Sequence, residues 1–129
     1  MSKLEDFLAV GKSTDITEDI TVKLGGKDFT LTIRALSARE HTEWQQRSTI
    51  VNKKTVAFDK GKYESLMLPA CIVEPNFNDA AFLEKAKCQT AWEFISSRFP
   101  AGVVEDISEK IQKLSGFDTI EMEIENAKN

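Results

Sequence analysis

Hydrophobic and polar residues alternate with a period of two in two segments near the start of the chain. The apolar members of this pattern are Ile20, Val22, Leu24, Phe29, Leu31 and Ile33. Such alternation is typical of strands with one buried face. Between the segments lies Gly25–Gly26, and paired glycines readily take the positive φ angles of a two-residue turn. The sequence therefore predicts a β-hairpin over residues 20–33, in which Val22 pairs with Phe29 and Ile20 with Leu31.

After residue 37 the apolar spacing becomes helical. Ser37 and Glu40 form a capping-box sequence, which predicts a helix from about Ala38 to the low fifties. Residues 52–61 are expected to be a loop or a frayed extension. A second helix is expected over residues 62–73, with a kink or a restart at Pro69. Shorter helices are predicted over residues 79–87 and 90–99, and a last one over 100–116 carries the apolar stripe Val103, Val104, Ile107, Ile111 and Leu114.

Both ends of the chain are expected to lie outside the globular part. Residues 1–19 are interpreted as a flexible lead, whose apolar side chains favour either a helical turn or an extended docking arm. Residues 118–129 are acidic and alternate apolar residues with Glu, which fits a strand or a tail that orders on a partner. The predicted fold class is α+β, with a single globular domain over residues 20–117. In it the hairpin packs on about four to five helices between residues 38 and 116.

Composition narrows the classes of partner. The formal net charge of −4 makes nucleic acid a poor partner, since no overall positive field attracts phosphate. The apolar run Phe7–Val10 is too short for a secretion signal and follows two acidic residues. No stretch approaches the length of a membrane span. We therefore expect a cytoplasmic protein without a membrane partner.

The sequence offers little catalytic chemistry. His41 is the sole histidine and lies between acidic residues of a predicted helix, where a packed or solvated role is favoured over that of a base. Cys71 and Cys88 lie on apolar helix faces, and with one histidine they cannot complete a four-ligand zinc site. We therefore predict no catalytic residue, no metal site and no cofactor, and the protein is not expected to be an enzyme.

Three segments of the chain form a recognisable series when they are taken together. The first is the hairpin running into Arg34–Ser37 and a helix rich in Glu and Gln. The second is Ala70–Phe77, an apolar helix end followed by a break with proline and phenylalanine. The third begins at Phe99–Val104 and closes with Leu114–Phe117, the sequence Leu-Ser-Gly-Phe. In their order and spacing over residues 20–117, these segments resemble the tail assembly chaperones of Gram-positive phages and prophages, the XkdN-like family.

The resemblance implies a non-enzymatic chaperone that binds the tape-measure protein and keeps it soluble until the tail tube polymerises around it. Other partners that it implies are the tail-tube protein and a longer form of the chain made by ribosomal frameshifting. Residues 127–129 can be encoded as GCA-AAA-AAC, which contains a slippery string, so reading the gene tests this point. Self-association is left open.

The residues proposed to contact the partner are the large apolar side chains of the last two helices. They are Trp92, Phe99, Ile107, Ile111 and Leu114. A binder of exposed apolar helices needs apolar patches rimmed by charge, and these side chains would supply one. The alternative is that all five belong to the core. Rival functions are a minor structural protein retained in the tail, or a small regulatory binding protein of a mobile element.

Overall fold

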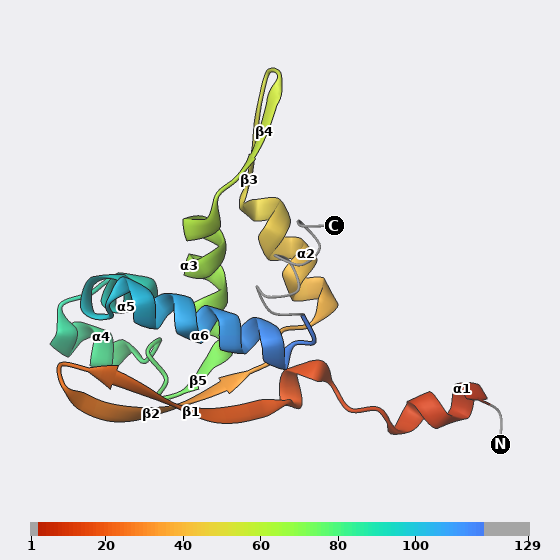
Figure 1. Cartoon of the computed structure of the whole chain (residues 1–129), viewed down its shortest axis with the longest axis horizontal. Coiled ribbons are helices and arrows are strands. Elements are labelled where there is room, and N and C mark those ends of the chain that lie inside the picture. Colours follow the sequence, from red (N-terminus) through yellow and green to blue (C-terminus); the bar gives the residue numbers. More distant parts are fainter. Residues whose placement is uncertain (1–2, 118–129) are drawn as a thin grey trace, which may run out of the picture.

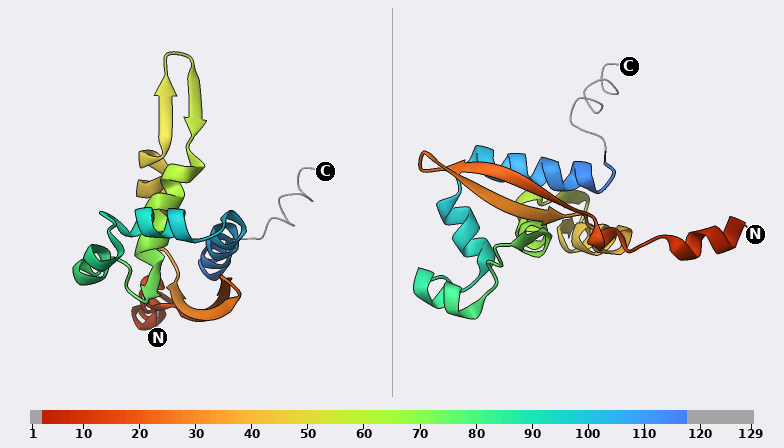
Figure 2. Two further views of the ribbon diagram at one scale, coloured as in Figure 1. Left: turned by 90° about the vertical axis from the view of Figure 1, so that its left-hand side faces the viewer. Right: turned by 90° about the horizontal axis from the view of Figure 1, so that it is seen from below.

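The computed structural model describes residues 3–117 of the chain. Figure 1 and Figure 2 show a curved sheet with helices packed on it, and two segments that project from this body. Its combination of an N-terminal hairpin and a mostly helical remainder confirms the predicted α+β class.

In chain order the elements are α1 (Lys3–Asp6), η1 (Phe7–Ala9), η2 (Ser13–Asp15), β1 (Thr17–Leu24), β2 (Lys27–Arg34), α2 (Ala38–Arg47), β3 (Thr49–Asn52), β4 (Thr55–Phe58), α3 (Lys60–Cys71), β5 (Ile72–Glu74), α4 (Ala80–Ala86), α5 (Ala91–Arg98) and α6 (Ala101–Leu114).

The first hairpin has the predicted register. β1 and β2 are antiparallel, with Val22 opposite Phe29 and Ile20 opposite Leu31. Gly25 and Gly26 form the turn with φ angles of 59° and 81°, a region that glycine enters without steric cost. β5, which was not predicted, joins the other edge of β2 and makes a three-stranded sheet in the order β1-β2-β5. A three-stranded sheet packed on helices has the support that an isolated hairpin lacks.

The core lies between one face of this sheet and helices α3, α5 and α6. α6 packs against β1, β2, α3 and α5, so it is the helix that joins the sheet to the rest of the domain. The largest side chains at its centre are almost completely removed from water: Ile33, Met67, Leu68, Ile95, Ile107 and Ile111. These residues come from both the sheet and the helices, so neither part would be stable without the other.

Helix α2 begins as predicted and ends earlier. The Ser37 hydroxyl accepts a hydrogen bond from the Glu40 amide, and the Glu40 carboxylate accepts one from the Ser37 amide, which completes the capping box. The helix was expected to reach the low fifties but ends at Arg47. The hydroxyls of Ser48 and Thr49 each donate to a carbonyl four residues back, which closes the last turn. The β-branched residues that follow then favour a strand over another helical turn.

The expected loop over residues 52–61 is largely a second β-hairpin, so that prediction was wrong. β3 and β4 are antiparallel, and Lys53–Lys54 form the turn between them. The strands consist mainly of Thr, Ile and Val, whose branched side chains favour extended backbone. Alternating burial, which revealed the first hairpin, is missing here because both faces of the second hairpin lie outside the core.

Helix α3 is continuous through Pro69, where a kink or a restart was expected. Pro69 lies two residues before the C-terminal end of the helix, so the hydrogen bond that it cannot donate is lost from the last turn and not from the middle of the helix. The helix was expected to continue to Val73 but ends at Cys71, because the next three residues form β5. Asp79, as predicted, caps α4 by accepting from the Phe82 amide.

The first residues form an arm that projects from the domain (Figure 1). Between the two alternatives left open by the sequence, the structure shows one helical turn, α1, continued by the 3-10 turns η1 and η2. β1 begins at Thr17, three residues before the strand predicted from the apolar pattern. The predicted acidic tail, residues 118–129, lies outside the described residues, and the division into lead, domain and tail stays a prediction.

Candidate interaction surfaces

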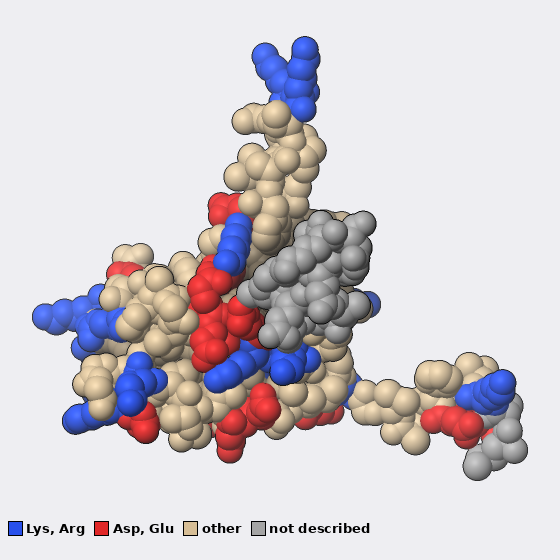
Figure 3. Space-filling view, in the orientation of Figure 1, with Lys and Arg blue, Asp and Glu red and all other residues tan. Residues whose placement is uncertain are grey.

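The β3–β4 hairpin presents apolar side chains to solvent along its length. Ile50, Val51, Val56 and Phe58 are 51–75% exposed. Val51 lies opposite Val56 and Thr49 opposite Phe58, and these two pairs share one face because side chains alternate along a strand. Figure 3 shows positive charge at the tip of the hairpin, where the turn residues Lys53 and Lys54 lie, and none on its strands.

The base of the hairpin is fixed to the domain. The Asp59 amide donates to the Ser48 carbonyl over 2.7 Å, which closes the end of the hairpin. The Phe58 ring lies 5.7 Å from the ring of Tyr63, measured between centroids. Tyr63 is buried and its hydroxyl lies 2.6 Å from Nδ1 of His41. The hairpin is therefore attached to the domain at its base, and its exposed apolar strands are placed to contact another chain.

An apolar groove lies between the tip of the first hairpin and helices α4 and α5. Its volume is about 450 Å³. Phe94 lies at its centre, stacked on Phe77 at 5.4 Å and edge-on to Phe82 at 4.9 Å. The guanidinium of Arg98 lies over the Phe94 ring at 5.4 Å and places positive charge at the rim. The lining residues are Leu24, Phe29, Thr30, Leu31, Pro75, Phe77, Phe82, Phe94, Arg98 and Phe99.

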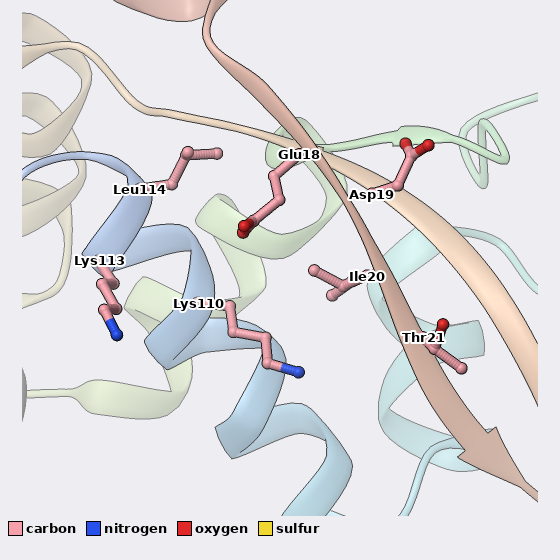
Figure 4. Close-up of a pocket in the computed structure, with 7 residues that line it drawn as sticks. All are labelled: Glu18, Asp19, Ile20, Thr21, Lys110, Lys113 and Leu114. Carbon is pink, nitrogen blue, oxygen red and sulfur yellow. The ribbon is translucent and has the colours of Figure 1, made fainter.

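A more polar hollow lies between β1 and the C-terminal half of α6. Figure 4 shows Glu18 and Ile20 projecting from the strand toward the helix side, with Lys110 and Lys113 opposite them and Asp19 turned away. The Asp19 carboxylate accepts a hydrogen bond from the Thr32 hydroxyl over 2.6 Å. The acidic side chain of Glu18 therefore faces the basic side chains of α6, an arrangement that suits solvated charges better than an apolar partner.

A smaller hollow at the base of the second hairpin is lined by two buried titratable residues, Tyr63 and Glu64. Glu64 is 8% exposed, and its Oε2 has no hydrogen-bond partner among the described residues. Burial, together with the negative charge of Glu105, raises the pKa of Glu64 above its usual range. Burial also raises the pKa of Tyr63 to about 12. His41 lines the same hollow, and its ring packs 4.9 Å from that of Phe117.

The cysteines have the surroundings of packed residues. Cys71 is buried, and burial raises the pKa of its thiol to about 12, so the thiol is protonated at neutral pH. Cys88 is half-buried, and its sulfur donates to the carbonyl of Ala86. Within residues 3–117 no cluster of three His, Cys, Asp or Glu side chains is placed to hold a metal ion. In the same part of the chain no helix has the length and apolar character needed to cross a membrane.

The structure separates the five residues predicted to contact a partner. Ile107 and Ile111 are 0% exposed, and Phe99 is buried, although it also lines the apolar groove. Trp92 and Leu114 are half-buried at the edge of the core. Phe99, Ile107 and Ile111 are part of the core cluster, as the alternative expected, and partner binding through any of the five residues stays a prediction.

Sequence reasoning missed the exposed surface of the second hairpin. A signal was present, since apolar β-branched residues flank Lys53–Lys54 on both sides. The helix predicted through Val51 obscured it. The groove was missed for a different reason: its walls come from β1, β2, α4, α5 and the segment around Pro75, which only the folded chain brings together.

The three segments that carry the family resemblance also meet in the fold. The Ser115 hydroxyl of the third segment accepts a hydrogen bond from the Leu36 amide of the first over 2.9 Å. Ile72 of the second segment pairs with Ile33 of β2. Phe77 of the second segment meets Phe99 of the third edge-on at 5.9 Å. The three segments therefore lie against one another in the folded domain.

Comparisons with known proteins agree with this arrangement. The model of the family described as phage XkdN-like tail assembly chaperone protein matches residues 4–128. A crystal structure described as that of the protein yqbn is similar with a TM-score of 0.56, covering 79% of this chain and 87% of that chain. At 15% identity this second likeness concerns the fold alone. No curated protein matched the chain. Because the family model spans nearly all of the sequence, this chain belongs to the XkdN-like phage tail assembly chaperones.

Proposed function

We propose that this protein binds the tape-measure protein of its phage tail and keeps it in solution until the tail tube polymerises around it. The observation that carries the proposal is the second hairpin, which projects from the domain and leaves four large apolar side chains more than half exposed among the described residues. An exposed apolar surface of this kind marks a binding site in a well-folded protein. A long tail protein awaiting assembly exposes complementary apolar helices, and covering them would prevent their aggregation.

The charge distribution supports reversible binding. The strands β3 and β4 carry no charge, while Lys53 and Lys54 at the tip hinder edge-to-edge pairing between copies of the hairpin. The net charge of −4 favours the solubility of a complex with an apolar partner. The proposed binding takes place in the cytoplasm of the host cell, needs no cofactor and involves no catalysis.

The first experiment is co-expression of the full chain with the tape-measure protein encoded beside it. Soluble tape measure that copurifies with the tagged chain supports the proposal. Insoluble and unbound tape measure contradicts it, provided that the frameshifted long form, tested in parallel, also fails to bind. Mass spectrometry of finished tails separates a chaperone from a structural component, because a chaperone is released and a structural protein remains.

The hairpin is tested by a pair of double variants. V51D/V56D places two charges on the face shared with Phe58, and because both side chains are exposed the core of the domain should be unaffected. We expect it to lose tape-measure capture by at least about tenfold, which corresponds to about 1.4 kcal/mol. N52D/T55D adds the same charges to the other face of the same hairpin and should retain capture. Equal capture by both variants would remove the hairpin from the interface.

A further inference from the structure

The N-terminal arm carries an apolar surface that the rest of its own domain does not cover. Leu4, Phe7, Leu8 and Val10 are 69–87% exposed. They lie on one helical turn and the 3-10 turn that follows it, so several large side chains are held close together. Among the described residues none of α1, η1 or η2 contains a buried side chain. Four exposed apolar side chains on a projecting arm indicate a surface that is covered by another molecule.

The apolar groove at the far end of the sheet has the complementary character. Phe29, Phe82 and Phe94 contribute rings to its lining, and the volume of about 450 Å³ is large enough to admit several side chains of an amphipathic turn. Its charge is also complementary. The arm contains Glu5 and Asp6, whereas Arg98 stands at the rim of the groove. Lys27, the partner of the lining residue Leu24, adds a second positive charge beside the hairpin tip.

In the described conformation the arm lies outside the groove of its own domain. The two lie at opposite ends of β1, which separates them by about 23 Å at the usual rise per strand residue (Figure 1). Residues 10–16, which link the arm to β1, would have to be fully extended to span this distance, at about 24 Å. The 3-10 turn η2 shortens this linker, and the Ile16 carbonyl is held by the Ala35 amide over 2.8 Å. The groove is therefore accessible to the arm of another copy.

We propose that the arm of one copy docks into the phenylalanine-lined groove of a second copy, so that the chains associate head to tail. The two surfaces are different, and a contact between different surfaces repeats until a ring closes or a filament forms. The interface is small, because a short arm buries less area than a standard protein–protein interface, so association should be weak in isolation. Under the proposed function, such a series would present one β3–β4 hairpin per copy along an elongated tape measure.

The test uses the full chain alone, without tape measure, so its outcome is independent of the proposed function. Sedimentation velocity is measured over a concentration series from about 10 µM to about 1 mM, the range expected for a small interface. The wild type should form species larger than a dimer as concentration rises. The arm variant F7D/L8D should remain a monomer at least about tenfold higher in concentration. S13D/T14D, with the same charges outside the apolar turn, should behave as the wild type.

The groove variants are F29E and R98E. Both side chains are exposed at the surface of the groove, so circular dichroism should confirm an unchanged fold. Each should remain monomeric alone. Mixed in equal amounts, F7D/L8D and F29E should form a heterodimer and nothing larger, because the mixture contains one intact arm and one intact groove per pair. This complementation is specific to a head-to-tail contact.

Three results would overturn the proposal. A wild type that stays monomeric at all concentrations excludes the contact. Association of F7D/L8D equal to that of the wild type excludes the arm, and failure of the mixture to form a heterodimer excludes head-to-tail docking. If F29E associates normally and loses tape-measure capture instead, the groove belongs to the tape measure.

Discussion

Two glutamates show how differently the fold treats the same side chain. Glu40 receives both terminal nitrogens of Arg34, at 3.0 Å and 2.8 Å, and caps α2 as well. The hydrogen bond from Arg34 lowers the pKa of Glu40 and is the largest cause of that shift. Glu64 has burial without such a partner, and its pKa is raised. One carboxylate therefore stabilises the folded state when ionised, and the other destabilises it.

Replacing each of these glutamates by Gln should change stability in opposite directions at neutral pH. E64Q removes a buried charge and should raise the free energy of unfolding by about 1 kcal/mol, whereas E40Q removes a charged hydrogen-bond acceptor and should lower it by about 1 to 2 kcal/mol. The stabilisation from Glu40 is present above its unfolded pKa and is lost as pH falls through the lower folded pKa. The penalty from Glu64 is present above its raised folded pKa and disappears as pH falls toward its unfolded pKa.

Urea unfolding of both variants and the wild type, repeated from pH 7 down to about pH 3, measures these differences. Both should shrink as the wild-type carboxyl groups become protonated and so resemble the neutral amides. An E64Q variant that is less stable than the wild type at pH 7 would show that the Glu64 carboxylate is better solvated than its burial implies.

At the scale of elements, the two hairpins are made differently. The first has a Gly–Gly turn, an alternating pattern and one face in the core, so its register is determined by both the turn and burial. The second has a turn of two lysines and no buried face, so strand propensity and its closed base hold it together. The first hairpin is therefore part of the folding core, and the second is free to serve as a contact surface.

The turn of the first hairpin gives a matched pair of glycine substitutions. G26A forces alanine into a φ of 81°, and we expect it to lower the free energy of unfolding by about 1 to 2 kcal/mol through backbone strain. G102A lies inside helix α6, where an added Cβ meets nothing within 4 Å, and should raise it by about 0.5 to 1 kcal/mol. Thermal and urea unfolding measure both changes. Equal effects would show that the turn geometry does not limit stability.

At the scale of the whole molecule, α6 is the element through which the sheet and the helices share one core. Its buried stripe faces β1, β2, α3 and α5 at once. The two projecting segments, the arm and the second hairpin, lie outside that core, and their exposed apolar side chains contribute little to it. A fold of this kind should lose its sheet and its helical packing in a single transition, while its contact surfaces tolerate substitution.

Ile111 and Leu114 test this division within one helix. I111A should lower the free energy of unfolding by about 2 to 5 kcal/mol, because the side chain is completely buried and the loss leaves a cavity. L114A, on the half-buried end of the same stripe, should cost clearly less. Unfolding followed by far-UV circular dichroism and by tryptophan fluorescence should give coincident transitions. Loss of tape-measure capture by L114A with little loss of stability would support the predicted role of Leu114 in binding.

Several elements of this protein follow from local rules and could be predicted from the amino-acid order. The Gly–Gly hairpin with its register, the Ser37 capping box and the amphipathic last helix each depend on residues close together in the chain. Tertiary structure alone decided that Ile107 and Ile111 are core, that residues 72–74 become a strand, and that residues 49–58 project as a hairpin. An apolar stripe has the same pattern whether it faces a core or a partner. Only the packing of distant elements determines which apolar side chains remain exposed to bind another chain.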